Sequence, residues 1–376
     1  MAGIYIHVPY CKTRCIYCNF YKETDEGNID AFVKALCSEF VLRKNETTDT
    51  IKTIYFGGGT PSRLSINHFK EIFNYIFQNY NIDADAEITI EANPDDLSKE
   101  YVDMLRNDLP INRLSIGIQS FDDDELKFLS RRHNGQQAID AVKYCQQVGF
   151  NNISIDLIYG LPNQTLELWM TNLQKAFELN VQHMSAYHLI YEKDTKLYNL
   201  LERGRVVPIV DDMSTAMFSM LIEQMSQNGF EHYEISNFAK DELYSKHNTS
   251  YWLDQKYIGF GPSAHSYDGS SRTWNIASLG KYILAMQEGQ LPQEGETLSS
   301  SEQYNEFILT KLGMMRGINI DVMKSRFGQE RVEYCLQLAK KYIDEGLLVH
   351  ENNKLRLTNK GIFISDGIMS GLMWIE

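Results

Sequence analysis

Apolar and polar residues alternate in blocks along the first half of the chain, in an order that predicts strands followed by helices. Between the blocks, apolar residues recur at helical spacing, as in Phe32, Leu36 and Phe40. Strands that alternate with helices favour right-handed β/α units around a parallel sheet. This α/β pattern fits a barrel, a partial barrel or an open doubly wound sheet. The short apolar, β-branched runs predict six strands, at 4–8, 53–56, 87–91, 113–119, 152–158 and 183–189.

The alternation weakens after about residue 202, where a different organisation begins. A helix is predicted near 215–225, followed by the polar, aromatic segment HNTSYW at 247–252. The polar stretch 289–301 predicts a linker. Beyond it, helices, a small hairpin and another helix predict a winged-helix-like C-terminal domain. We therefore expect a barrel domain, a barrel extension and a C-terminal domain, at residues 1–240, 241–290 and 291–376.

Composition narrows the functional classes. The chain has 376 residues, with 36 basic against 50 acidic side chains and a net charge of −14. Such a charge argues against binding to nucleic-acid phosphates or to an anionic membrane surface. The N-terminus has neither the basic start nor the apolar run of a signal peptide, and no apolar stretch approaches the ~20 residues of a membrane span. We expect a cytoplasmic protein with no nucleic-acid partner and no membrane span.

Three cysteines lie close together directly after the first predicted strand. Cys11, Cys15 and Cys18 form C-x3-C-x2-C, and a cysteine cluster in a cytosolic protein more often indicates metal than a disulfide. Soft thiolates suit an iron–sulfur cluster or a tetrahedral zinc ion. Structural zinc normally has four protein ligands, and here only His7 could complete the set, so three thiolates favour a [4Fe–4S] cluster with one open iron. The other cysteines lie on apolar helix faces and are predicted to be core residues: Cys37, Cys145 and Cys335.

Polar residues and glycines follow the carboxyl ends of the predicted strands, where ligands of parallel β/α folds bind. In GGGTP, residues 57–61, the glycines allow a ligand to approach the backbone. Glu91 can accept a ligand ammonium, and Gln119 and Asp156 can hydrogen-bond to ribose hydroxyls. Arg131 can pair with a carboxylate. GGGT matches neither the Walker pattern nor GxGxxG, so a nucleoside triphosphate or NAD site is not predicted.

Taken together, YIHVPYCKTRCIYC, YFGGGTPS, EANPDDL, RLSIGIQSF, SRRH and SIDLIYGLP resemble the radical S-adenosylmethionine superfamily. More narrowly, the chain resembles the family of oxygen-independent coproporphyrinogen III oxidase and the HemW-type haem chaperones. The resemblance implies a partial TIM-like barrel of six β/α units with a C-terminal helical domain. It implies that the three clustered cysteines hold a [4Fe–4S] cluster, and that S-adenosylmethionine binds its open iron and is cleaved by an electron from the cluster, with an electron donor as a partner. The residues that match family positions around this cofactor are Tyr5, Tyr17, Gly58, Gly59, Thr60, Glu91, Gln119, Arg131 and Asp156.

Two departures separate the branches of this family. Phe20 stands where the oxidases carry a further cysteine, and the chain reaches Tyr5 without the N-terminal extension of the oxidases. HNTSYW resembles the HNxxYW segment of the haem-chaperone branch, in which the histidine is implicated in haem binding. His247 is therefore the expected haem contact; the other interpretation is a loop turn over a Tyr–Trp core patch. The remaining candidate histidines are expected to be structural: His7, His188 and His265.

These observations predict a haem chaperone that uses the cluster, S-adenosylmethionine and haem and delivers haem to client haemoproteins. The first alternative is an oxygen-independent coproporphyrinogen III oxidase, whose activity the replacement of cysteine by Phe20 makes doubtful. The second is a zinc-dependent binding module. Whether the chain is an enzyme is left open by the sequence.

Overall fold

The predicted strands form the centre of one large sheet in the computed structural model, which describes residues 2–375. The sheet order is β12-β11-β10-β9-β1-β2-β3-β4-β5-β6-β8-β7, and each pair from β1 to β6 is parallel. The fourth strand has the predicted bounds, and the others differ by up to five residues at an end. The strands are β1 (Ala2–Val8), β2 (Ile51–Gly58), β3 (Ile82–Ala92), β4 (Arg113–Gln119), β5 (Ile153–Tyr159) and β6 (His183–His188).

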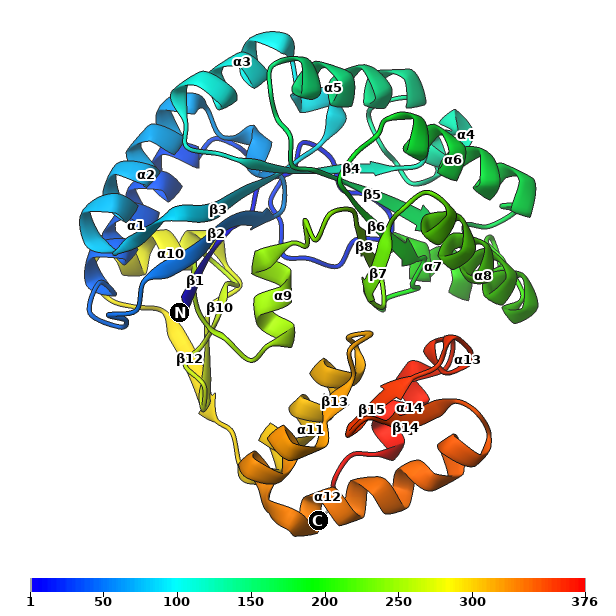
Figure 1. Ribbon diagram of the computed structural model, residues 1–376. Helices are drawn as coiled ribbons and strands as arrows, with labels where there is room; N and C mark the ends of the chain where they lie inside the picture. Colours follow the sequence, from blue (N-terminus) through cyan, green and yellow to red (C-terminus); the bar gives the residue numbers. More distant parts are fainter. Residues whose placement is uncertain (1, 376) are drawn as a thin grey trace.

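Helices cover the outer side of the curved sheet (Figure 1). Helix α2 shows why they form: Ser65 caps it in a capping box with His68, and its apolar face is buried. On that face the ring of Phe69 lies 5.2 Å from the ring of Phe56 on β2. The helices of this layer are α1 (Ile29–Leu42), α2 (Ile66–Asn79), α3 (Lys99–Asp108), α4 (Asp123–Phe128), α5 (Gly135–Gln147), α6 (Leu166–Glu178) and α8 (Asp211–Gln227). The short helix α7 (Lys196–Glu202) instead packs through Leu197 in a small apolar cluster with Ile16.

The sheet continues with further strands beside β1 and beside β6, and within residues 2–375 it does not close into a barrel. Strand β9 (Lys256–Phe260) runs parallel beside β1, and β10 (His265–Tyr267), β11 (Ser271–Asn275) and β12 (Gln293–Thr297) continue antiparallel. At the other end β8 (Asn237–Ala239) pairs with β6, and β7 (Glu231–Glu234) pairs with β8. Within residues 2–375 the order ends at β12 and β7, so the expected partial barrel is confirmed.

The linker expected at 289–301 is wrong for much of its length. Residues Gln293–Thr297 form β12 and pair with β11 from Ser271 to Asn275, and helix α11 already begins at Ser300. The stretch is polar because four of the five strand residues are exposed. It lies at the edge of a sheet, where one side of the strand faces water. The boundaries at 240 and 290 stay predictions.

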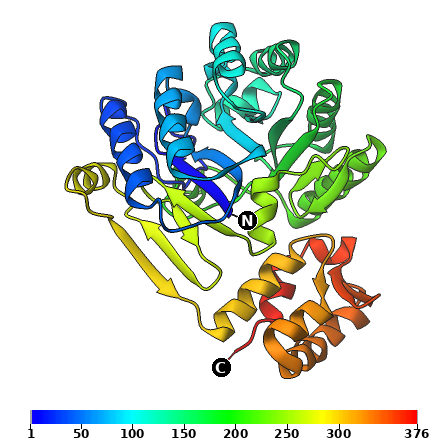
Figure 2. The same cartoon turned by 60° about the vertical axis from the view of Figure 1, so that its left-hand side comes forward.

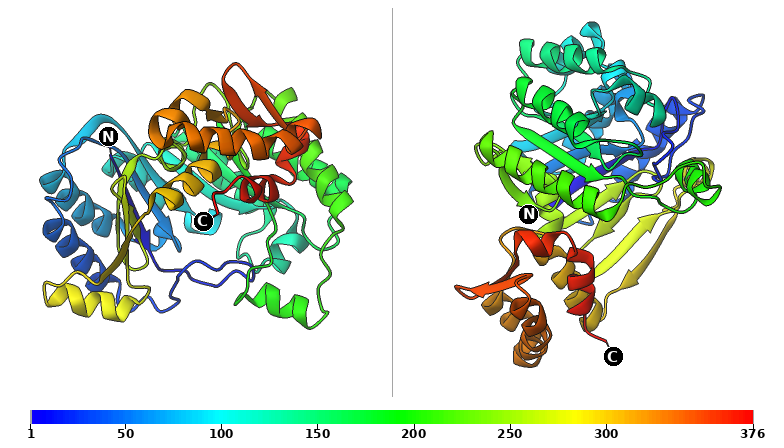
Figure 3. Two further views of the ribbon diagram at one scale, coloured as in Figure 1. Left: turned by 90° about the horizontal axis from the view of Figure 1, so that it is seen from below. Right: turned by 90° about the vertical axis from the view of Figure 1, so that its right-hand side faces the viewer.

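The C-terminal region has the helices and small sheet expected of a winged-helix-like domain. Figures 2 and 3 show it as a separate lobe next to α9 (Lys246–Trp252), the helix that contains the HNTSYW segment. The lobe is tied to the barrel by backbone hydrogen bonds from Ile235 to Gly313 and from Met315 to Tyr233, both 3.1 Å. Its elements, preceded by α10 (Leu279–Gln287), are α11 (Ser300–Leu312), β13 (Ile318–Asn319), α12 (Ile320–Asp344), β14 (Leu348–Glu351), β15 (Lys354–Leu357), α13 (Asn359–Ile362) and α14 (Ser365–Gly371).

A buried ion pair joins α1 to the barrel extension. Arg43 and Glu39 are 1% and 0% exposed, with 2.9 Å between Nη1 and Oε1. Arg43 also donates to the Gly259 carbonyl at 2.6 Å, and Glu39 accepts from Asn275 at 2.8 Å and from Tyr282 at 2.6 Å. Because each charge has several partners, the pair can remain ionised away from water. It fixes β9 to β11 against the first helix.

Candidate functional site

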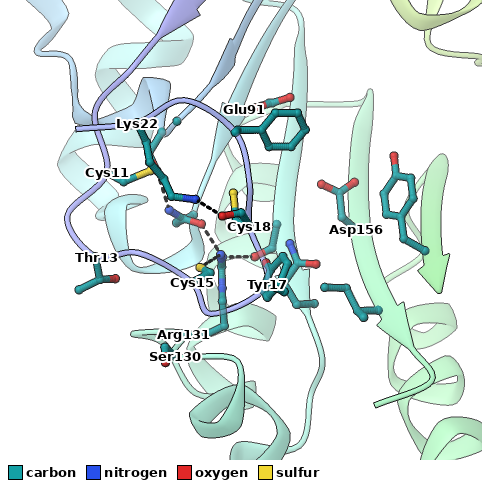
Figure 4. Close-up of a pocket in the computed structure, with 18 of the residues that line it drawn as sticks. Cys11, Thr13, Cys15, Tyr17, Cys18, Lys22, Glu91, Ser130, Arg131 and Asp156 are labelled. Carbon is teal, nitrogen blue, oxygen red and sulfur yellow. Dashed lines mark hydrogen bonds between the residues drawn. The ribbon is translucent and has the colours of Figure 1, made fainter. Parts of the chain in front are cut away.

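A pocket of about 470 Å³ opens at the carboxyl ends of the parallel strands (Figure 4). Side chains from the cysteine loop and from the ends of β2, β3, β4 and β5 converge on it. Most residues singled out in the sequence therefore meet in one place. Those that line the pocket are Cys11, Cys15, Tyr17, Cys18, Gly58, Gly59, Thr60, Glu91, Gln119, Arg131 and Asp156.

The cysteine loop is fastened at three places. The backbone N–H of Cys11 donates to the Glu23 carbonyl at 2.9 Å, which closes the base of the loop. Ile16, in the middle, is 4% exposed and packs in a small apolar cluster. Its carbonyl accepts from the N–H of Leu197 at 2.8 Å. Lys22 donates from Nζ to the Cys18 carbonyl at 2.7 Å. The loop thus presents its thiols while its apolar residue anchors it.

Each of two thiols has a polar neighbour. Cys11 Sγ lies 3.3 Å from Thr60 Oγ1, and Arg131 donates from Nη1 to Cys15 Sγ at 3.5 Å. Burial raises the pKa of the Cys11 thiol, so a thiolate at this position needs a compensating positive charge, which a metal centre supplies. All six cysteines are free thiols. The loop therefore has the donor set of an iron–sulfur site.

Close packing requires the three glycines at 57–59, the last two residues of β2 and the one that follows it. An added Cβ on Gly59 would lie 2.7 Å from the Tyr10 carbonyl oxygen and 2.8 Å from that of Val8. Gly58 has a φ of +102°, a conformation that favours glycine. A Cβ on Gly57 would lie 3.1 Å from Glu91 Oε1. The glycine turn can therefore pass between the cysteine loop and the end of β3 only without side chains.

Two non-glycine residues at the pocket have left-handed backbones. Gln119, the last residue of β4, has a φ of 71°, and Ser130, directly before Arg131, has a φ of 62°. The pairing of β4 with β5 shifts register between Gly117 and Gln119. Positive φ in such residues costs free energy and is concentrated at functional sites. Here it re-aims the end of β4 and the start of the SRRH segment.

Two carboxyl groups line the pocket, those of Glu91 and Asp156. Burial raises the pKa of Glu91 to about 7, and burial raises the pKa of Asp156 to about 6. Glu91 Oε1 accepts a hydrogen bond from Tyr55 at 2.7 Å. Since burial penalises a carboxylate that lacks a counter-charge, a ligand ammonium beside Glu91 would lower the cost of ionising it.

Arg131 is held so that part of its guanidinium stays free. Its Nη2 donates to the Gly117 carbonyl at 2.5 Å and to the side-chain oxygen of Asn93. Its Nε is buried and has no hydrogen-bond partner among the described residues. An unpaired buried donor is costly and indicates a missing acceptor, so the site fits a ligand carboxylate. The sequence reasoning missed Asn93, although it lies within the EANP motif.

The two residues that follow Arg131, Arg132 and His133, contact other parts of the protein. Arg132 forms ion pairs with Asp95 at 2.7 Å and with Asp96 at 3.1 Å. His133 is 4% exposed and its Nε2 lies 3.0 Å from the Ile118 carbonyl. Both Arg131 Nε and His133 Nδ1 lack a hydrogen-bond partner among the described residues. Arg131 lines the pocket, as does Arg132, whereas His133 does not.

Two of the expected site residues line a separate chamber instead. This chamber has a volume of about 180 Å³ and adjoins the larger pocket, with which it shares Glu91, Ser115, Asp156 and Tyr187. Tyr5 and His247 lie here and do not line the larger pocket. Arg113, which is 1% exposed, also borders the chamber, and its Nε has no partner among the described residues. Tyr5 therefore shares this chamber with Glu91 and Asp156 but does not line the larger pocket with the other cofactor candidates.

His247 is a buried, fully hydrogen-bonded histidine. It is 1% exposed, its Nδ1 lies 2.8 Å from Thr53 Oγ1, and its Nε2 lies 2.8 Å from Tyr251 Oη. The ring stacks on Tyr55 with 5.0 Å between centroids. Burial lowers the pKa of His247 to about 3, so the ring is neutral. HNTSYW is a helix, α9, rather than the loop turn of the second interpretation. The haem contact of His247 stays a prediction.

Most of the other residues expected to be structural are buried or lie away from the pockets, but His188 is exposed and lines the larger pocket. The remaining cysteines, Cys37, Cys145 and Cys335, are 3%, 0% and 0% exposed. His7 is 4% exposed, and burial lowers its pKa to about 4. His265 stacks on Trp274 away from both pockets. His188 lies beside the larger pocket, but its Nε2 is hydrogen-bonded to Ser214 on α8.

Comparison with known proteins places this geometry in a family. Residues 5–176 match the radical SAM superfamily, and residues 298–364 match the HemN C-terminal domain. The chain is 33% identical to heme chaperone HemW of Bacillus subtilis, over 99% of this chain and 99% of that protein. It is 33% identical to heme chaperone HemW of Lactococcus lactis, over 97% and 95%. The chain belongs to the HemW family.

HemW-family membership agrees with the fold and with the cofactor site. Coproporphyrinogen III oxidase of Escherichia coli has the same fold, with a TM-score of 0.85 at 22% identity over 99% of this chain and 90% of that chain. The radical SAM superfamily has a [4Fe–4S] cluster and S-adenosylmethionine as its cofactors. Among residues 2–375, no three histidine, cysteine, aspartate or glutamate side chains group closely enough to hold one metal ion. A cluster binds each thiolate on a different iron, so its ligands need not meet at one point.

Among residues 2–375, no helix combines the length and the apolar character that crossing a bilayer requires.

Proposed function

We propose that this chain is a haem chaperone, which binds haem and delivers it to client haemoproteins. The observation that carries the proposal is a similarity that runs through nearly the whole chain and nearly the whole of proteins named heme chaperone HemW. A match of both domains in one order favours a shared function over a shared cofactor domain alone. In this proposal the further partner is an electron donor that reduces the cluster, and the protein acts in the cytoplasm without nucleic acid.

We assign the cofactor residues from the pocket. Cys11, Cys15 and Cys18 would hold the [4Fe–4S] cluster, since they are the thiols that line the pocket. Glu91 would accept the ammonium group of S-adenosylmethionine and the free Nε of Arg131 would donate to its carboxylate. The bound cofactors supply one-electron chemistry at the sulfonium. The further residues proposed to line this cofactor are Tyr17, Gly58, Gly59, Thr60, Gln119 and Asp156, with Tyr5 in the adjoining chamber.

The protein's own contribution is to orient and to enclose. The left-handed backbone at Gln119 aims the end of β4 into the pocket, and the glycine turn brings the backbone of β2 close to the ligand. Because the carboxyls of Glu91 and Asp156 are buried, their hydrogen bonds to a ligand are stronger than they would be in water. These features position a ligand without requiring the side chains to reorganise.

The test is anaerobic reconstitution of the cluster followed by titration with ferric haem and transfer to an apo-haemoprotein. The proposal expects a Soret shift with saturable binding, and loss of the bound haem to the acceptor. Absence of any haem binding by cluster-loaded protein would refute it. Two alternatives are tested on the same sample. Sustained conversion of coproporphyrinogen III with S-adenosylmethionine and a reductant would favour the oxidase. One zinc per chain without iron or sulfide would favour the binding module.

A further inference from the structure

The chamber that adjoins the cofactor pocket lies where bulky side chains usually fill a barrel. In parallel β/α barrels the inward residues of the strands pack the centre, and branched apolar residues dominate there. Here three neighbouring strands each place a serine at the chamber, Ser115 on β4, Ser154 on β5 and Ser185 on β6. These small side chains leave about 180 Å³, the liquid volume of about six waters. The barrel therefore keeps a polar space at its centre.

Arg113 brings a positive charge to this chamber. Residues of β4 alternate between two faces: Leu114 and Ile116 belong to the apolar core, whereas Arg113 and Ser115 line the chamber. Arg113 is 1% exposed, and its Nε has no hydrogen-bond partner among residues 2–375. Among the described residues that line the chamber, it is the one arginine or lysine. Because a guanidinium stays protonated when buried, the chamber contains a cation without a direct partner.

Two carboxyl groups border the same space. Glu91 and Asp156 line both the cofactor pocket and the chamber. Burial raises the pKa of each, and the charge of Arg113 opposes this by attraction. Neither carboxyl is hydrogen-bonded to Arg113 in the part of the chain that the structure describes. Since the interior screens charge less than water does, Arg113 can act on both carboxyls across the chamber.

The other titratable groups around the chamber do not supply this charge. Burial lowers the pKa of His247 on α9 to about 3 and holds the pKa of His183 on β6 well below its ordinary value, so both rings are neutral. Arg131 attracts Asp156, but it lines the cofactor pocket and not the chamber. The tyrosines are also neutral, because burial raises the pKa of each: Tyr5, Tyr55, Tyr187, Tyr233 and Tyr251.

We propose that Arg113 is a positioning residue for S-adenosylmethionine: its charge, facing Glu91 and Asp156 across the chamber, favours the carboxylate forms that bind the cofactor. Arg113 does not line the cofactor pocket, so it acts through the two carboxyls. This inference rests on the proposed function in one respect, the assignment of Glu91 to the ammonium group of the cofactor.

The test compares variants that differ in where a charge is lost. Arg113→Gln removes the charge at the chamber, and Arg113→Lys keeps it. Arg106→Gln removes an equal charge from the exposed last turn of α3, away from both cavities. Titration calorimetry measures the affinity of cluster-loaded protein for S-adenosylmethionine between about pH 6 and about pH 8. In cluster-free protein, NMR of carbon-labelled glutamate side chains follows the ionisation of Glu91, whose signal is identified by its loss in Glu91→Gln.

Arg113→Gln is expected to raise the pH at which Glu91 ionises by about one unit. At neutral pH the ionised fraction of Glu91 then falls from about a half to about a tenth, so S-adenosylmethionine should bind about fivefold more weakly. Arg113→Lys and Arg106→Gln should stay close to the parent. All proteins are compared at the same pH, so the titration of the cofactor itself cancels.

A second variant keeps the test decisive if Arg113→Gln does not fold. Asn248 lines the same chamber, and Asn248→Asp adds a negative charge there with little change of shape, so it should shift the ionisation of Glu91 in the same direction. An unshifted Glu91 in the variant that folds would overturn the inference. An equal shift in Arg113→Lys or in Arg106→Gln would also overturn it, since the charge at the chamber would then not be the cause. A parent whose affinity does not rise with pH would instead refute the assignment of Glu91, while the NMR titration would still test Arg113.

Discussion

Gly59 supports a quantitative prediction about the cysteine loop. The variant Gly59→Ala adds one methyl group at the turn that follows β2. That methyl would lie 2.7 Å from the Tyr10 carbonyl oxygen, 2.8 Å from that of Val8 and 2.9 Å from the Pro9 carbonyl carbon. All three are backbone atoms of the segment that leads into Cys11, and the N–H of Gly59 donates to the Val8 carbonyl at 2.8 Å. The methyl group can be accommodated only if the backbone moves.

The expected cost follows from this overlap. Overpacking by one methyl group in a close-packed interior costs about 1–3 kcal/mol, and the substitution brings no φ strain that would add to this value, because the φ of Gly59 is not in the left-handed range. In a domain of this size, about 1 kcal/mol lowers the Tm by about 2 °C. We therefore expect the cluster-free variant to unfold about 2–6 °C below the parent, with less iron bound after reconstitution because the loop is displaced.

The matched control is Gly280→Ala. Gly280 lies in α10, and an added Cβ would meet no atom within 4 Å. Alanine favours a helix over glycine by about 1 kcal/mol, so this variant is expected to unfold slightly above the parent and to bind iron normally. The assays are circular dichroism during heating of the cluster-free protein, and iron and sulfide analysis after anaerobic reconstitution. Parent-like Tm and iron content in Gly59→Ala would refute the packing argument.

Three further predictions use the same preparations. Titration calorimetry should show that S-adenosylmethionine binds more tightly as the pH rises from about 6 to about 8. Burial raises the pKa of Glu91 to about 7, so over this range its carboxyl ionises and becomes a stronger partner for an ammonium group. The variant Glu91→Gln should bind S-adenosylmethionine weakly and lose much of this pH dependence. Arg43→Ala should lower the free energy of unfolding in urea by about 3–5 kcal/mol, since it leaves a buried carboxylate unpaired, whereas Lys52→Ala, at a partly exposed ion pair, should cost less than about 1 kcal/mol. Cys18→Ala should fail to hold a stable cluster, and Cys37→Ala, which removes a thiol from the buried core, should bind iron as the parent does.

Each of these has a contradicting result. A cofactor affinity in Glu91→Gln that matches the parent at every pH would show that another group binds the ammonium. Equal urea midpoints for the Arg43 and Lys52 variants would mean that the buried ion pair adds no more than a surface pair. Parent-like iron content in Cys18→Ala, or its loss in Cys37→Ala, would reassign the ligands.

The repeating strand and helix pattern of the barrel was predictable because it is set by local periodicity. The β4 prediction matched at both ends, since Arg113 and Gln119 bound an apolar run. Segment 289–301 was misjudged for the opposite reason: β12 is held by pairing with β11, and an exposed edge strand carries little apolar signal of its own.

The residues of the candidate site also fall into those that the sequence predicted and those that it missed. Cys11, Cys15 and Cys18 were recognisable because their short spacing places three soft ligands on one loop at one pocket. Strand-end residues such as Glu91 were recognisable because the parallel sheet brings its carboxyl ends to one edge. Asn93, which positions Arg131, was missed because nothing in its local sequence shows that contact.

The sequence by itself determined the order of strands and helices, the soft-ligand loop and the family, because each depends on residues close together in the chain or on a motif. Only the tertiary structure decided which side chains share a cavity. It buried His247 against Thr53, which is 194 residues away in the sequence. It also placed Phe20 and Ile190 at the larger pocket. It also paired Arg43 with the carbonyl of Gly259, across 216 residues. Such contacts arise from packing between distant segments, which local periodicity does not specify.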